Sequence, residues 1–331
     1  MKVLKFGGTS VGSAQRMKEV AKLITDGERK IVVLSAMSGT TNTLVEISDY
    51  LYKKNPEGAN EIINKLESKY RQHIDELFAT PEYKQKGLEL IKSHFDYIRS
   101  YTKDLFTLFE EKVVLAQGEL ISTAMMNYYL QECGVKSVLL PALEYMRTDK
   151  NAEPDPVYIK DKLQVQLELH PDAEIYITQG YICRNAYGEI DNLQRGGSDY
   201  TASLIGAAIN ASEIQIWTDI DGMHNNDPRI VDKTAPVRHL HFEEAAELAY
   251  FGAKILHPTC IQPAKYANIP VRLLNTMDPT APGTLISNDT EKGKIKAVAA
   301  KDNITAIKIK SSRMLLAHGF LRKVFEIFES Y

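Results

Sequence analysis

Cysteine is scarce in this chain of 331 residues, which contains only three. Cys133, Cys183 and Cys260 are odd in number and lie in no metal-ligand spacing, and the eight histidines are scattered along the chain. This pattern excludes a disulfide-stapled secreted scaffold and a zinc-binding cluster. We therefore expect reduced thiols and a cytoplasmic protein.

Long hydrophobic runs and an excess of basic residues are also absent. No apolar stretch approaches the length of a membrane span, and Met1-Lys2 leads directly into a strand-like run without a signal peptide. The formal net charge of −3 leaves no basic excess that could displace the counterions of a nucleic acid. We expect neither a membrane nor a nucleic acid as a partner.

The best-known nucleotide-binding motifs are missing as well. In the glycine-rich segment at residues 5–12 the glycines stand at 7, 8 and 12, which does not fit the G-x-G-x-x-G pattern of dinucleotide-binding folds. No stretch fits the G-x-x-x-x-G-K-[ST] phosphate loop, and the H-R-D and D-F-G motifs of protein kinases do not occur. These absences argue against an NAD-binding domain, a P-loop enzyme and a protein kinase.

Two glycine-rich segments are present instead, at residues 5–12 and 195–202. Each opens into a run with helical spacing, and each carries a cation, Lys5 in the first and Arg195 in the second. Backbone N–H groups at the start of a helix can hold an anion. One such segment is equally explained by a tight strand–helix turn that needs glycine for its backbone angles. Two of them, each with a cation, indicate two anionic groups that are brought face to face.

Strand-like and helical runs alternate along most of the chain. The strand candidates are residues 2–6, 31–37, 136–140, 173–178, 213–218 and 269–274. This alternation predicts a doubly wound α/β fold, whose mainly parallel sheet has helices on both faces. Residues 53–112 interrupt it with a long charged segment that carries helical stripes, and we expect a helical excursion there.

The character of the sequence changes after a turn-rich connector at residues 276–283. Residues 295–298 and 304–309 alternate like half-buried strands, and residues 320–328 carry a helical apolar stripe. So few elements cannot bury that stripe alone. We expect a first domain at residues 1–290 and, at residues 291–331, a second α+β domain that the chain contains only in part.

A third informative block runs from Trp217 to Arg229 and begins at the end of a strand, where open α/β sheets place their ligands. A calcium loop is excluded because the glycine and the twelfth residue are misplaced. Thr218, Asp219 and Arg229 suit a nucleotide, through hydroxyl, carboxylate and phosphate contacts, although a plain turn explains the Asp-Pro pair equally well. Further on, Lys254 stands beside glycine, which also fits an ordinary helix C-terminus.

Taken together, these blocks resemble the amino-acid kinase family and, within it, the members that phosphorylate L-aspartate. The resemblance spans nearly all of residues 1–290 and rests on motifs that stand in the family's order. These are Lys-Phe-Gly-Gly-Thr-Ser-Val at 5–11, Gly-Glu at 118–119, Arg-Gly-Gly-Ser-Asp at 195–199, Trp-Thr-Asp at 217–219, Asp-Pro-Arg at 227–229 and Phe-Gly-Ala-Lys at 251–254.

The resemblance implies transfer of the γ-phosphoryl group of ATP to the β-carboxylate of L-aspartate, with Mg²⁺ held mainly by the ATP phosphates and no resident metal. A carboxylate acceptor is already ionised at neutral pH, so the reaction needs no general base, but two anions must approach in line. In this interpretation Lys5 and Lys254 neutralise the transferring group, Asp199 orients the lysines or the metal, and the N–H groups of Gly7 and Gly8 add fixed dipoles.

The same resemblance assigns residues to the two substrates. Arg195 suits a carboxylate of the amino acid and Glu119 suits its α-ammonium group. The remaining acceptor-side candidates are Ser35, Thr41, Gly197 and Ser198. The nucleotide-side candidates are Gly7, Gly8, Thr218, Asp219, His224, Arg229, Lys254 and Ile255.

The tail resembles the start of an ACT domain, the small regulatory module attached to these kinases. The candidate residues for binding L-lysine as an inhibitor are Met314, His318, Gly319, Phe320, Leu321 and Val324. A homodimer is expected by the same resemblance. Two alternatives stay open at this point: a carbamate kinase or another amino-acid kinase of the same fold, such as a glutamate 5-kinase, and a catalytically silent subunit that senses an amino acid.

Overall fold

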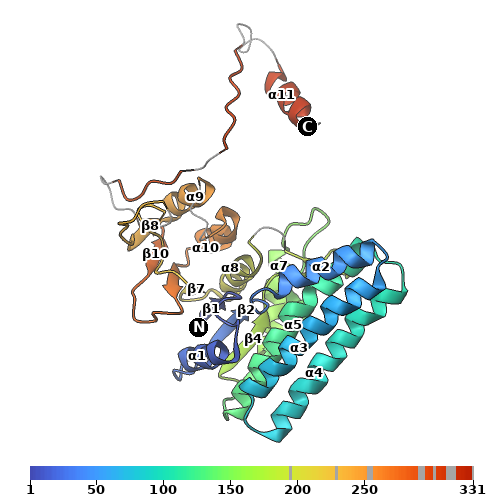
Figure 1. Ribbon diagram of the computed structural model, residues 1–331. Coiled ribbons are helices and arrows are strands. Elements are labelled where there is room, and N and C mark those ends of the chain that lie inside the picture. Colours follow the sequence, from blue (N-terminus) through green and yellow to red (C-terminus); the bar gives the residue numbers. More distant parts are fainter. Residues whose placement is uncertain are drawn as a thin grey trace. The chain divides into compact units, whose positions relative to one another are not determined.

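A computed structural model describes residues 1–193, 196–227, 230–251, 256–289, 295–300, 303–310 and 318–329 of the chain. It divides into two compact units, Met1–Ala299 and Ala300–Tyr331. The first unit contains the sheet and almost all of the helices (Figure 1).

The first unit is built on one eight-stranded sheet with the order β3-β4-β2-β1-β7-β9-β10-β8. All neighbouring strands run parallel except β9 and β10, which are antiparallel. The strands are β1 (Lys2–Phe6), β2 (Lys30–Leu34), β3 (Ser137–Leu140), β4 (Ile175–Gln179), β7 (Ile214–Thr218), β8 (His239–His241), β9 (Val271–Asn275) and β10 (Thr284–Ser287). A separate antiparallel pair joins β5 (Ile182–Arg184) and β6 (Ile190–Asn192).

The six strands that the sequence predicted are present, and the prediction of a mainly parallel sheet is confirmed. The predicted strand at residues 31–37 is too long, because β2 ends at Leu34. Ala36 and Met37 are buried in the loop that follows, so their apolar character continued the pattern without continuing the strand. The sequence did not predict β5, β6, β8 and β10, which are only three or four residues long.

Helices cover both faces of the sheet (Figure 1). They are α1 (Ala14–Ile24), α2 (Thr40–Tyr52), α3 (Pro56–Leu77), α4 (Pro81–Ser100), α5 (Leu108–Glu132), α6 (Ala142–Tyr145), α7 (Pro156–Glu168), α8 (Gly197–Ile209), α9 (Phe242–Tyr250) and α10 (Gln262–Tyr266), with short 3₁₀ turns η1 (Tyr101–Lys103) and η2 (Pro258–Ile261). Successive residues of a strand point to opposite faces. Thus Leu4 belongs to the core beneath α1 to α5, and Val3 belongs to the core beneath α6 to α10.

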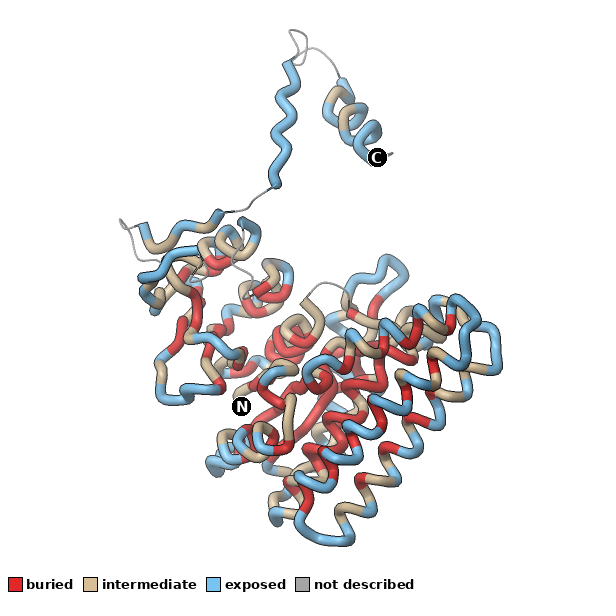
Figure 2. Tube along the Cα trace, in the orientation of Figure 1, coloured by how far each residue is buried: buried red, intermediate tan, exposed pale blue. Residues whose placement is uncertain are grey.

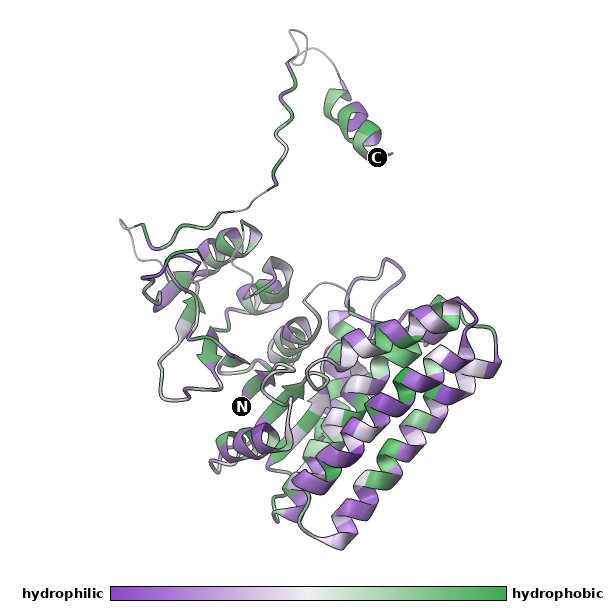
Figure 3. Ribbon diagram, viewed as in Figure 1, coloured by the Kyte–Doolittle hydropathy of each residue, from purple (hydrophilic) through white to green (hydrophobic). Residues whose placement is uncertain are grey.

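The expected helical excursion at residues 53–112 consists of α3, α4 and the start of α5, which pack side by side with α2 (Figure 1). Of the predicted stripe, Leu66, Tyr70 and Ile74 are buried and Ile62 is half-buried. Most of the charged residues of α3 lie on its outer face, although Glu67 is buried. Figure 2 shows the buried positions along the inner sides of these helices, and Figure 3 shows that the outer sides are hydrophilic.

The predicted strands at residues 295–298 and 304–309 are wrong for the residues that the structure describes. Residues 295–300 and 303–310 have no strand geometry, and Ile295, Ile304 and Ile307 are exposed. An alternating pattern forms a strand only where another strand offers an edge to pair with. The predicted helix is present as α11 (Phe320–Glu329), with no buried residue (Figure 2). Across the described residues, we find no helix with the length and apolarity needed to cross a bilayer.

Candidate active site

The loops that follow four central strands lie at one edge of the sheet. Phe6 of β1 is in register with Leu34 of β2 and Trp217 of β7, and Leu34 is in register with Gln179 of β4. Because parallel strands end at the same edge, the segments after these four residues come together there. They include the first glycine-rich segment and the loop at residues 35–39.

The two glycine-rich segments meet through an ion pair between Lys5 and Asp199. The Nζ atom of Lys5, on β1, lies 2.7 Å from Oδ1 of Asp199, in the first turn of α8. Both side chains are mostly shielded from solvent, with exposed fractions of 11% and 16%. Gly7 adjoins the pair, because a Cβ atom at that position would lie 3.4 Å from the Lys5 Nζ. The two segments therefore lie together, whereas the two anionic groups that we expect them to bind stay a prediction.

Helix α8 begins at a point where only glycine fits. Its N-cap, Gly196, has a φ of 88°, and a Cβ atom there would lie 1.7 Å from Sγ of Cys260. Gly197 has a φ of 38°, which also favours glycine. The cap makes no side-chain hydrogen bond to the first turn, so backbone N–H groups at this helix start are available to an anion.

A cavity of about 380 Å³ lies between this helix start, the loop at residues 35–39 and helix α5. Its walls contain six of the residues that the sequence singled out: Gly8, Ser35, Thr41, Glu119, Gly197 and Ser198. The other residues of the wall, which are not among the site residues predicted from the sequence, are Ala36, Met37, Ser38, Gly39, Asn42 and Tyr181. The Ser35 hydroxyl donates a hydrogen bond of 2.9 Å to the Ser198 hydroxyl and so joins two sides of the cavity.

Glu119 is the only carboxylate among the described residues that line this cavity. It projects from α5, is 3% exposed, and its Oε2 atom has no hydrogen-bond partner within the described part of the chain. Burial raises the pKa of Glu119 to about 7, although hydrogen bonds with the backbone of Ala36 and of Glu119 itself oppose this effect. A buried carboxylate without a partner is unfavourable unless a cation joins it.

The position of Glu119 is fixed by contacts one turn further along α5. The Ser122 hydroxyl donates a hydrogen bond of 2.8 Å to the Ser35 carbonyl, and the Gln179 side chain at the end of β4 donates one of 2.8 Å to the Thr123 hydroxyl. Gly118 lets the helix approach closely, since a Cβ atom there would lie 2.7 Å from Cβ of Ala36. These contacts fix α5 against the end of β4 and the loop after β2, and with α5 the position of Glu119.

The remaining nucleotide-side candidates in the described residues lie outside the cavity wall, at the end of β7 and in the loop that follows it. The Thr218 hydroxyl accepts a hydrogen bond of 3.2 Å from the Ile220 N–H, and Asp219 is exposed. A hydrogen bond of 2.8 Å joins Nδ1 of His224 to the Thr234 hydroxyl. Arg195, Arg229, Lys254, Ile255 and Met314 lie outside the described residues.

Comparison with known proteins identifies the family to which the chain belongs. A profile described as the amino acid kinase family matches residues 1–275. The chain belongs to the amino acid kinase family. Within it, the similarity is to aspartokinases. Aspartokinase 1, chloroplastic, of Arabidopsis thaliana is 38% identical, over 99% of this chain and 59% of that protein. Lysine-sensitive aspartokinase 3 of Escherichia coli (strain K12) is 34% identical, over 98% of this chain and 73% of that protein.

A solved aspartokinase structure is similar to this one over the whole chain. The crystal structure of E. coli aspartokinase III in complex with aspartate and ADP superposes with a TM-score of 0.84 at 32% identity. The match covers 100% of this chain and 74% of that one. The present chain spans 59 to 62% of the length of the three Arabidopsis aspartokinases that it matches.

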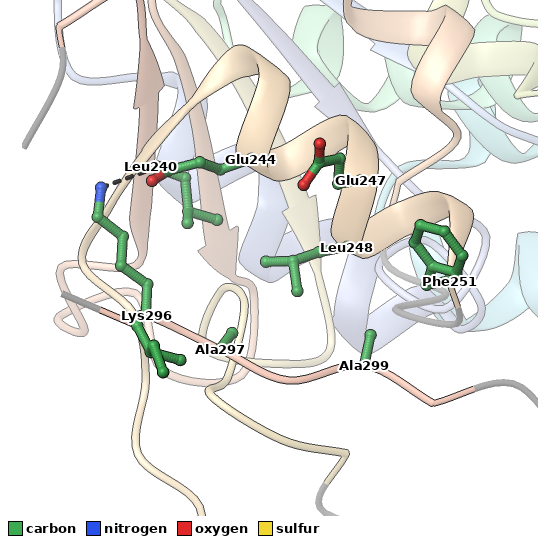
Figure 4. Close-up of a pocket in the computed structure, with 9 residues that line it drawn as sticks. Leu240, Glu244, Glu247, Leu248, Phe251, Lys296, Ala297 and Ala299 are labelled. Carbon is green, nitrogen blue, oxygen red and sulfur yellow. Dashed lines mark hydrogen bonds and ion pairs between the residues drawn. The ribbon is translucent and has the colours of Figure 1, made fainter. Parts of the chain in front are cut away.

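In this amino acid kinase, residues 295–299 contact both α9 and the loop after β7. Lys296 forms an ion pair of 2.8 Å with Glu244, whose carboxylate also accepts a hydrogen bond from the His241 N–H and caps α9 (Figure 4). The Val298 N–H donates a hydrogen bond of 2.9 Å to the Asn225 carbonyl. A second cavity, of about 250 Å³, lies between this segment and α9 (Figure 4).

We expect Lys296→Met to lower the free energy of unfolding by about 1 kcal/mol near neutral pH, a modest value because Glu244 is partly exposed. Burial alone would raise the pKa of Glu244, but the bonds from Lys296 and the His241 backbone outweigh it and lower the pKa. The stabilisation is therefore present at neutral pH and lost as the pH falls through the lowered pKa.

Urea unfolding of the parent and the variant at pH 7 and at about pH 3.5 measures this difference. The matched control is Lys265→Met, which removes a more exposed pair with Glu243 of the same helix and should change stability by less than about 0.5 kcal/mol. A loss for Lys296→Met that is equally large at both pH values contradicts the ion-pair explanation.

Proposed function

We propose that this chain transfers the γ-phosphoryl group of ATP to the β-carboxylate of L-aspartate, giving 4-phospho-L-aspartate, the first step of the lysine, threonine and methionine pathway. The observation that carries the proposal is the buried, unpartnered Oε2 of Glu119 in a cavity bordered by the start of α8. The likeness to the E. coli aspartokinase III complex with aspartate and ADP supports the same choice of substrates.

The cavity suits an amino acid with a second carboxylate. The α-ammonium group would pair with Glu119, which gains the cation that its burial requires. The N–H groups at the start of α8 and the hydroxyls of Ser35, Thr41 and Ser198 would bind carboxylate oxygens. Arg195, which lies outside the described residues, is proposed as the bidentate partner of a carboxylate.

In the proposed reaction, the protein accelerates phosphoryl transfer by neutralising negative charge. The acceptor carboxylate is already a nucleophile, so the barrier lies in bringing it to an anionic phosphoryl group. Lys5, in the first glycine-rich segment, is held by Asp199, in the second, so its charge is positioned before the reaction begins. Lys254 is proposed as the second cation, and the N–H groups of Gly7 and Gly8 as fixed dipoles.

We propose Mg²⁺ as a cofactor that arrives with ATP. Its ligands would be mainly phosphate oxygens and water. When bound, Mg²⁺ would supply positive charge at the phosphates. The base, ribose and phosphates of ATP would contact the segments that contain Thr218, Asp219, His224, Arg229 and Ile255.

We further propose that residues 1–290 form the catalytic domain and that residues 291–331 belong to a small regulatory domain of the ACT type in a cytoplasmic homodimer. Lysine would bind near His318, Gly319, Phe320, Leu321 and Val324, where α11 begins, together with Met314. The similarity to lysine-sensitive aspartokinase 3, which extends over 98% of the chain, supports this assignment. Calorimetric titration with L-lysine tests it, and an absence of heat at millimolar lysine counts against it.

The proposed reaction is tested by ADP release with Mg²⁺-ATP and one acceptor at a time. L-aspartate should stimulate ADP release, whereas L-alanine, which lacks the β-carboxylate, should leave the background rate unchanged. Equal rates with both acceptors would show that the hydrolysis of ATP does not depend on the carboxylate, and would overturn the proposal.

A further inference from the structure

Tyr181 has a backbone conformation that a tyrosine rarely adopts. It follows β4 by two residues, and its φ of 69° lies in the left-handed region. For a bulky side chain this conformation is strained, whereas glycine would adopt it without cost. Strained residues of this kind concentrate at binding and catalytic sites, where the surrounding structure holds them.

Two hydrogen bonds hold Tyr181 in this conformation. Its N–H donates to the Thr201 hydroxyl at 3.0 Å, and its carbonyl accepts from the Leu193 N–H at 2.6 Å. Thr201 belongs to α8, and Leu193 lies two residues before the second glycine-rich segment. The backbone of Tyr181 is thus fixed from both sides by the elements that form the anion-binding end of the cavity.

The ring of Tyr181 forms part of the cavity wall at the start of α8. A Cβ atom placed on Gly197 would lie 3.2 Å from Cδ2 of the ring, so the ring packs directly against that glycine. The same cavity is lined by Glu119 and Ser198. Burial, together with the negative charges of Glu119 and Asp191, raises the pKa of Tyr181 to about 12, so the side chain stays uncharged at neutral pH.

We propose that the Tyr181 ring sets the length of the acceptor, admitting a four-carbon amino dicarboxylate and rejecting the five-carbon one; this inference rests on the function proposed above. Glu119 fixes the ammonium end of the acceptor from α5, and Lys5 fixes the place where its distal carboxylate must react. The ring stands at the cavity wall beside Gly197. The backbone of Tyr181 is held at both its N–H and its carbonyl, and the side chain packs against both hydrophobic cores, so a longer chain would have to displace a packed ring.

One added methylene group is enough for the ring to distinguish the five-carbon acceptor from the four-carbon one. It displaces the reacting carboxylate by about 1 Å, and a misplacement of this size costs about a hundredfold in rate. Rejection of a longer substrate by a rigid apolar surface therefore needs no hydrogen bond. The rejection of the longer acceptor therefore comes from the ring and not from the phenolic hydroxyl.

Three variants separate specificity from structure. Tyr181→Gly removes the ring and relieves the backbone strain, and Tyr181→Asn removes the ring with a residue that tolerates positive φ. Tyr181→Phe keeps the ring and removes the hydroxyl. Calorimetric affinities and kcat/KM are measured for L-aspartate and for L-glutamate with each protein, and melting temperatures report on folding.

We expect the preference for aspartate over glutamate to fall at least tenfold in Tyr181→Gly and Tyr181→Asn. Tyr181→Phe should keep the preference within about twofold. A parental preference in both ring-deleted variants overturns the inference, as does a lost preference in Tyr181→Phe. A parent that binds neither amino acid defeats the proposed function itself, and the length selection with it.

Discussion

Replacing Lys5 with methionine is expected to lower the turnover number about a hundredfold, which corresponds to about 3 kcal/mol of lost transition-state stabilisation. The Lys5 side chain is 11% exposed, and its Nζ atom is held 2.7 Å from Oδ1 of Asp199. It is therefore a preorganised charge, which needs no reorientation when the phosphoryl group moves. Methionine keeps most of the side-chain volume, so the variant should remain folded. Steady-state kinetics with aspartate and Mg²⁺-ATP measure the effect.

The matched control for this prediction is Lys2→Met. Lys2 lies on the same strand and pairs with Glu28, but its side chain is 37% exposed and lies at the start of the strand, away from the loops of the site. We expect its turnover number to stay within about twofold of the parent. A turnover number that is unchanged in Lys5→Met, with the far-ultraviolet circular dichroism of the parent, removes Lys5 from the catalytic role.

The second large effect is expected at Glu119. In Glu119→Gln the affinity for L-aspartate should fall at least a hundredfold, because the ammonium group loses the only carboxylate among the described residues that line the cavity. The empty protein, by contrast, should become more stable above neutral pH. Burial raises the pKa of Glu119 from 4.5 to about 7 in the folded state, so the folded protein binds this proton more tightly than the unfolded chain does.

The sign of the pH dependence follows from that shift. As the pH rises from about 4.5 to about 7, the parent loses stability, by about 3 kcal/mol at most, because the folded state must ionise a buried group. Glutamine cannot ionise and avoids this loss. Urea unfolding at pH 5 and at pH 8 should therefore show a gain for Glu119→Gln that is larger at pH 8. A gain that does not depend on pH would contradict the assignment of the shift to Glu119.

Ligand binding gives an independent check on the same residue. At pH 7 about half of the empty sites carry the proton, and an ammonium group that binds the carboxylate expels it. Calorimetry in buffers of different ionisation enthalpy should detect release of about half a proton per aspartate bound. The residual binding of Glu119→Gln should show no such release.

Much of this architecture could be predicted from the sequence, for physical reasons. Buried parallel strands are short apolar runs, so six strands of the large sheet were visible in the sequence: β1, β2, β3, β4, β7 and β9. The glycines at 7, 8, 196 and 197 mark places where the backbone comes close to other groups, and both segments do meet at the Lys5–Asp199 pair. Because strand ends share one edge, motifs far apart in the sequence could be placed together.

Other features depend on tertiary contacts that no local pattern contains. The positive φ of Tyr181 is imposed by Thr201 and Leu193, and a tyrosine in the sequence gives no sign of it. The alternation at residues 304–309 predicted a strand, but a strand requires a neighbouring edge, and the described residues show none beside it. The burial of Glu119 likewise comes from its position on α5, which is covered on several sides.

The central claim is that the β-carboxylate of aspartate becomes an acyl phosphate in the cavity that Glu119 and the start of α8 share. The most direct test is to trap that product with hydroxylamine in the presence of Mg²⁺-ATP and to identify the hydroxamate by mass spectrometry. We predict aspartyl β-hydroxamate in an amount equal to the ADP released, and none when aspartate is omitted. ADP release without hydroxamate, or hydroxamate from glutamate alone, would contradict the claim.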